Sequence, residues 1–135
     1  MALQDQSRMQ EIDSQGDVIL VCRAAMHDAD YTKIRVSSVV LTRASPVFAR
    51  TLGPRYRENV QLPSTSAIEI PLLTDDVKTL VHLLDVIHVR NTAAPQTLKV
   101  LVDIVNLARK YACLDAVKPA GHRWLDELKG YDTHF

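Results

Sequence analysis

The chain has 135 residues, of which 47% are hydrophobic, and its 16 lysines and arginines equal its 16 aspartates and glutamates. This composition predicts one folded domain with a sizeable core and excludes an intrinsically disordered chain. The neutral charge balance argues against nucleic acid or an anionic membrane surface as the main partner, and no apolar run reaches the roughly 18 residues of a membrane-spanning helix.

Residues 1–15 are predicted to form a flexible or short N-terminal arm, because they are mostly polar. Met9 and Ile12 are three residues apart, so a short helix would place them on one face. A frayed terminus and such a helix are both open at this point. The folded domain is expected over residues 16–129, followed by a C-terminal tail over residues 130–135.

The first two elements are predicted strands that form a hairpin. The run "DVILVC" at residues 17–22 is continuously aliphatic, which is typical of a strand covered on both faces. The segment "YTKIRV" at residues 31–36 alternates apolar or neutral residues with charged ones, which is typical of a half-buried strand.

Two short helices are predicted to meet at a sharp corner at Ser45-Pro46. Pro46 has no N–H and fits the first position of a helix, while Ser45 before it can accept from the free N–H groups of that helix. One helix is therefore expected from about Ser37 to the corner. A second begins at Pro46, with Phe48 and Leu52 on its buried side.

Residues 53–67 have the composition of a loop, and "IEIPLL" at residues 68–73 is predicted to be an edge strand because it contains Pro71. Thr74 is expected to cap the next helix, with two aspartates in its first turn.

A longer helix is predicted from Pro95 to about Ala112, and its wide apolar surface indicates a central position in the domain. Its buried face is expected to comprise Leu98, Leu101, Val102, Val105, Ala108 and Ala112. A final helical segment follows, which Pro119 is expected to split or kink. This order of elements predicts an α+β fold in which a small three-stranded sheet is capped by a cluster of about five to six helices.

Three segments together resemble the BTB/POZ family, and most of all the divergent BTB domains of filamentous fungi. They are "DVILVC", the "L…SPxF" pattern of Leu41 to Phe48, and "LARKYACL" from Leu107 to Leu114. The resemblance extends from about Asp17 to Leu128. It implies a non-enzymatic protein-interaction module that forms homodimers or assembles with a heterotypic BTB partner.

The resemblance also implies candidate site residues. Tyr56, Arg57 and Glu58 match an apolar-x-Glu triplet that members of the family use to bind a cullin ubiquitin ligase scaffold, so a substrate-adaptor role is the alternative function. The candidate dimer-interface residues are Met9, Ile12, Val39 and Arg43.

One departure from the family pattern concerns its charged pocket. The family commonly has a basic residue after the second strand, where this chain has Ser37 and Ser38. Ser38 cannot pair with Asp17 as a cation, which argues against corepressor binding through this pocket.

No enzymatic chemistry is predicted from the sequence. It contains no glycine-rich phosphate loop and no nucleophile elbow, and His82 and His88 would lie about 240° apart around a helix, too far around to share a metal. We therefore expect no catalytic residue, metal or cofactor. The remaining alternative, a small ligand-binding protein or enzyme, requires a pocket with convergent titratable groups.

The two cysteines, Cys22 and Cys113, lie in separate apolar segments without metal-ligand spacing. We interpret them as buried thiols of a protein in a reducing compartment, although a disulfide between them stays open. Residues 1–16 also lack the apolar region of a secretory signal. Both features predict an intracellular protein, cytoplasmic or nuclear.

Overall fold

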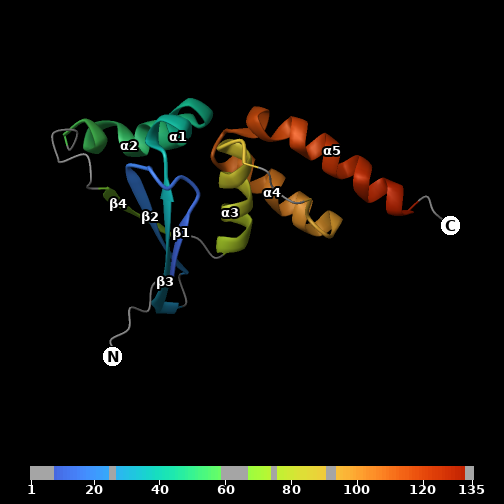
Figure 1. Cartoon of the computed structure of the whole chain (residues 1–135), viewed down its shortest axis with the longest axis horizontal. Helices are drawn as coiled ribbons and strands as arrows, with labels where there is room; N and C mark the ends of the chain where they lie inside the picture. Colours follow the sequence, from blue (N-terminus) through green and yellow to red (C-terminus); the bar gives the residue numbers. More distant parts are fainter. Residues whose placement is uncertain (1–7, 25–26, 59–66, 74–75, 91–93, 133–135) are drawn as a thin grey trace.

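The computed structural model describes residues 8–24, 27–58, 67–73, 76–90 and 94–132. These residues form an α+β fold with a four-stranded mixed sheet and five helices (Figure 1). The strand order is β1-β3-β2-β4, and β1 (Arg8–Glu11) lies within the expected N-terminal arm. The prediction of a three-stranded sheet is therefore wrong, because β1 adds a fourth strand by pairing in parallel with β3 (His27–Val36).

The predicted hairpin is confirmed. Strand β2 (Val18–Ala24) pairs antiparallel with β3, with Leu20 opposite Ile34. Since successive residues of a strand point to opposite faces, the completely buried Val18, Leu20 and Ile34 all point to the helical side. This side of the sheet forms one wall of the core.

The other face of β2 is covered by long side chains of its neighbours. Ile19 and Val21 are each only 8% exposed although they lie outside the main core cluster. The register places Glu69 beside Ile19 and Lys33 beside Val21, and these two charged side chains form an ion pair of 3.1 Å across β2. The aliphatic run of β2 is thus protected on one face by helices and on the other by charged side chains whose stems lie along it.

Strand β4 (Ile68–Leu73) pairs in parallel with β2 and lies at the edge of the sheet. This confirms the edge position that was predicted from Pro71, which is exposed. The loop predicted over residues 53–67 is wrong in its first part, because helix α2 (Pro46–Glu58) continues to Glu58. Residues 59–66 lie outside the described residues.

The corner at Ser45-Pro46 is confirmed. Helix α1 (Ser38–Ala44) ends before it, and α2 begins at Pro46. The Phe48 N–H donates to the Ser45 hydroxyl oxygen at 3.0 Å, which is the expected capping bond. Phe48 and Leu52, on the inner side of α2, are 2% and 1% exposed.

Three further helices complete the fold: α3 (Val77–Ile87), α4 (Leu98–Lys110) and α5 (Leu114–Asp132). Asp76 caps α3, so the expected cap at Thr74, which lies outside the described residues, is too early in the chain. Thr97 caps α4, which begins at Leu98, three residues after the predicted start at Pro95. Pro119 lies inside α5 without splitting it. In the described part of the chain, no helix is both long and apolar enough to cross a membrane.

Helix α3 is central, and the predicted central position of the longer helix is wrong. Figure 1 shows α3 between the sheet and the pair α4 and α5, and it contacts β3 and α1 as well as that pair. Leu98 and Val102 of α4, which were expected to be buried, are 56% and 46% exposed because α4 packs on α3 and α5 with its other side.

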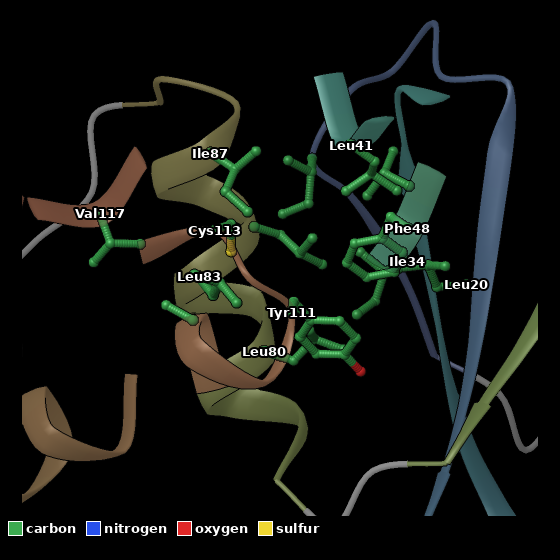
Figure 2. Packing of buried hydrophobic residues seen from close by; sticks show 14 of the residues in the cluster. Leu20, Ile34, Leu41, Phe48, Leu80, Leu83, Ile87, Tyr111, Cys113 and Val117 are labelled. Atoms are coloured by element: carbon green, nitrogen blue, oxygen red, sulfur yellow. The ribbon is translucent and has the colours of Figure 1, made fainter. Parts of the chain in front are cut away.

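The core brings together side chains from every layer of the fold (Figure 2). The buried side chains of α3 are in the middle of this core: Leu80, Leu83 and Ile87. On one side they face the sheet and the helix corner, and on the other side they face buried residues that follow α4, such as Cys113 and Val117. Next to them, the Phe48 and Tyr111 rings stack with centroids 4.6 Å apart and planes 8° apart. Offset stacking of this kind adds to the stabilisation from apolar burial, so the corner is joined directly to the α4–α5 junction.

Candidate protein-interaction surface

The start of α1 is fixed by the Asp17 carboxylate. The Ser38 N–H donates to one carboxylate oxygen at 2.8 Å, and the Ser38 hydroxyl donates to the other at 2.7 Å. Ser38 is 2% exposed, so these bonds form in a partly dry environment. At the place where the BTB/POZ family commonly has a basic residue, a buried hydroxyl and a helix N-terminus supply donors to Asp17.

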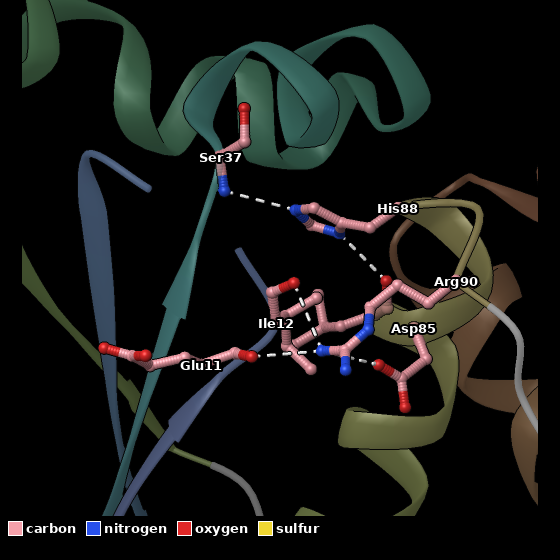
Figure 3. A network of polar contacts seen from close by, with 7 residues as sticks. Glu11, Ile12, Ser37, Asp85, His88 and Arg90 are labelled. Atoms are coloured by element: carbon pink, nitrogen blue, oxygen red, sulfur yellow. Dashed lines mark hydrogen bonds and ion pairs between the residues drawn. The ribbon is translucent and has the colours of Figure 1, made fainter. Parts of the chain in front are cut away.

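A histidine joins the end of α3 to the start of α1 (Figure 3). The Ser37 N–H donates to His88 Nε2 at 3.1 Å, and His88 Nδ1 lies 2.9 Å from the Leu84 carbonyl oxygen. Because Nε2 accepts, the proton of the neutral ring is on Nδ1 and is donated to Leu84. Burial lowers the pKa of His88 and so favours this neutral form.

An arginine joins the same end of α3 to β1 (Figure 3). Arg90 Nη1 donates to the carbonyl oxygens of Glu11 and Ile12 at 3.0 and 3.1 Å, and it lies 3.5 Å from Asp85 Oδ1. His88 and Arg90 therefore hold both neighbouring elements in place from one helix end. The sequence interpretation missed both roles, although basic residues just after an apolar helix often bind carbonyl oxygens.

The candidate dimer-interface residues divide into exposed and buried ones. Met9 and Val39 are 49% and 52% exposed, and Arg43 is also exposed, whereas Ile12 is 9% exposed and belongs to the core of this chain. The Ile12 N–H donates to the Arg35 carbonyl oxygen at 3.0 Å, which places the end of β1 beside the start of α1. We call the exposed residues Met9, Val39 and Arg43 the α1–β1 surface.

The candidate triplet Tyr56, Arg57 and Glu58 lies in the last turns of α2 and not in a loop. The side chains of these three residues are outside the part of the structure that is described. Their role in binding a partner stays a prediction.

Three side chains that could do chemistry, Cys22, Cys113 and His82, are engaged in packing. Burial raises the pKa of both Cys22 and Cys113 to about 11, so both are neutral thiols and poor nucleophiles near neutral pH. The His82 ring packs edge-on against Trp124 with centroids 5.5 Å apart. Among the described residues, no group of three or more histidine, cysteine or acidic side chains is placed to hold a metal ion.

A comparison with known proteins found no protein-family model and no curated protein that matches this chain. A functional interpretation must therefore start from the surface itself. The α1–β1 surface combines exposed apolar side chains with an arginine on a firmly held helix, which is a composition typical of protein interfaces.

Proposed function

We propose that this chain is a non-enzymatic interaction module of the BTB/POZ type, which assembles with a second copy or with a related domain through the α1–β1 surface. The observation that carries the proposal is Val39, a large apolar residue that is 52% exposed on a helix whose opposite side is completely buried at Leu41. Single exposed apolar residues are common, but Val39 lies on a helix that is firmly held.

Helix α1 is anchored at both ends. At its start the Ser38 N–H and hydroxyl bond to Asp17, and at its end the Ser45 N–H donates to the Leu41 carbonyl oxygen at 2.9 Å. A rigid helix loses little conformational freedom on binding, so more of the contact energy remains as affinity.

Arg43 extends the same side of α1. It follows Val39 by four residues and therefore lies one turn further along the same face. An exposed arginine next to an apolar residue suits an interface, because arginine combines apolar contact area with directional hydrogen bonds. Met9 on β1 is a second exposed apolar side chain, and because its register partner Lys33 lies on the face of the sheet away from the helices, Met9 would take part from that face.

Light scattering over a concentration series tests the proposal. We expect a defined oligomer for the unmodified chain and a dissociation constant at least about tenfold higher for Val39→Asp, because a charge would be buried without a partner. Val102→Asp is the matched control, since Val102 is also exposed, at 46%, but lies on α4.

Two outcomes would count against the proposal. A strictly monomeric chain would remove self-assembly and leave only binding to a related domain, which Val39→Asp must then weaken more than Val102→Asp does. Equal effects of the two substitutions on the measured mass would place the interface somewhere other than α1.

A further inference from the structure

A cavity lies on the molecule between the end of α3 and the first half of α5. Its volume is about 270 Å³, and Val86, Pro119, Ala120 and Trp124 give it an apolar lining. Trp124 is 3% exposed and Ala120 is 7% exposed, so the lining is well packed. Small-molecule and cofactor sites usually have volumes of roughly 300–1,000 Å³, so this cavity is suited to little more than one large side chain.

The charges around this cavity are positive. Arg90 and Arg123 both line it, and none of its described lining residues is acidic. Arg90 is engaged with the carbonyl oxygens of Glu11 and Ile12 and lies 3.5 Å from Asp85, whereas Arg123 is exposed on α5. Arg123 at the rim is therefore the charge that would attract a carboxylate close to an apolar group.

Val89 on the edge of the cavity has an unusual conformation. Its φ is 58° and it is 89% exposed. A β-branched residue with a positive φ is strained, and the position after a helix end normally has glycine. Such strain concentrates at binding sites, and here it presents an apolar side chain at the edge of the cavity.

We infer that this cavity binds a short segment of a partner protein in which one large apolar side chain is flanked by aspartate or glutamate. The apolar side chain fills the cavity against Trp124 and Val89, and an acidic neighbour lies at Arg123. The inference goes beyond the proposed assembly through the α1–β1 surface. It depends on other elements, so either proposal can fail without the other.

Trp124 is the only tryptophan of the chain and therefore reports directly on the cavity. The probe is a synthetic peptide without tryptophan that has a central Leu-Phe pair with aspartates on both sides. We expect it to change the Trp124 fluorescence saturably and to bind more weakly at high salt. Matched peptides, with lysine in place of aspartate or serine in place of the Leu-Phe pair, should produce no saturable change.

Substitutions on the protein test the two chemical components separately. Arg123→Glu should weaken binding of the acidic peptide on the order of fivefold or more, because it replaces an attractive charge by a repulsive one. Arg109→Glu is the control, since Arg109 is also exposed but lies on α4 outside the cavity. Val89→Gly should also weaken binding while raising the urea midpoint, a pair of effects that general loss of folding cannot produce.

Several results would overturn the inference. They are the absence of saturable binding to the folded chain, equal binding of the lysine peptide, and equal losses with Arg123→Glu and Arg109→Glu. A further control is a peptide whose only carboxylate is its C-terminus. If this peptide bound more tightly than the probe with flanking aspartates, the ligand would be a chain terminus and not an internal acidic segment. Urea unfolding of each variant verifies that it is folded. If Arg123→Glu does not fold, Arg123→Gln replaces it in the binding measurement.

Discussion

The Ser45 hydroxyl donates to the Tyr111 carbonyl oxygen at 2.5 Å, across 66 residues of sequence. The same hydroxyl oxygen accepts from the Phe48 N–H at 3.0 Å. One buried serine therefore caps α2 and also satisfies a carbonyl group at the end of α4. The corner that ends α1, the helix on which Val39 is exposed, is thus held by tertiary structure as well as by local capping.

Replacing Ser45 with alanine should lower the free energy of unfolding by about 2–3 kcal/mol, since it removes a helix cap worth about 1 kcal/mol and leaves a buried carbonyl group without its donor. Urea denaturation measures the difference. Ser14→Ala is the control, because Ser14 is exposed and its loss should change stability by less than about 0.5 kcal/mol. Equal effects of the two substitutions would show that Ser45 does not hold the corner.

The helix corner and the hairpin were predictable because their signals are local. Pro46 and Ser45 are adjacent, and the strands around Leu20 and Ile34 carry their own apolar patterns. Strand β1 was not predictable in this way. It is short and polar, and it is held by backbone pairing with β3, which leaves no pattern in the side chains.

The role of each apolar helix face could not be read from periodicity alone. The spacing of Leu98 and Val102 shows that they share a side of α4, but only the packing against α3 and α5 decides that this side is exposed. The candidate surface shows the same limit. Val39 and Ile12 were expected at one interface, and the tertiary structure exposes the first and buries the second.

Two glycines should respond in opposite directions to the same substitution. A Cβ on Gly16 would clash with the Val36 carbonyl oxygen, which is backbone and cannot move away cheaply. Gly16→Ala should therefore lower the free energy of unfolding by on the order of 3 kcal/mol.

Gly121 is the matched position, because it lies inside α5 and a Cβ there would meet nothing within 4 Å. Gly121→Ala should raise stability by about 0.5–1 kcal/mol, since alanine favours the helix. Thermal unfolding of both variants checks the pair. A tolerated alanine at Gly16 would contradict the close approach of the backbone.

His88 should make stability depend on pH near neutrality. Its pKa in the folded chain is lowered from the ordinary 6.5, mainly by burial. Between the lowered value and 6.5 the unfolded chain binds more protons, so stability increases with pH in this window. The contribution is complete above pH 6.5 and is lost as the pH falls towards the folded pKa, because protonated Nε2 cannot accept from the Ser37 N–H.

Urea denaturation at a series of pH values, with His88→Gln as the comparison, measures this contribution. The unmodified chain should lose more stability than His88→Gln between pH 7.5 and the lower end of the window. Asp76 does not interfere, because its pKa is lowered from 3.8 by its bonds to Thr79 and it titrates in more acidic solution. Parallel pH profiles would show that the imidazole is not part of the link between α3 and α1.

The ends of α3 and α4 have the same backbone geometry without the usual glycine. Val89 N–H donates to the Val86 carbonyl oxygen at 3.0 Å and Arg90 N–H to that of Asp85 at 2.9 Å, which is a Schellman motif with Val89 at the left-handed position. Ala112 takes the same position after α4, with a φ of 55°.

Val89→Gly should raise the free energy of unfolding by about 1 kcal/mol and Ala112→Gly by about half as much, because glycine relieves the positive φ but adds freedom to the unfolded chain. Val102→Gly is the control with the same chemical change in an ordinary helical conformation, and it should destabilise α4 by about 0.5 kcal/mol or more. Urea midpoints of the three variants decide the matter. If Val89→Gly and Val102→Gly shifted the midpoint in the same direction, Val89 would not be strained, and the conformational argument for its role at the cavity would fail with it.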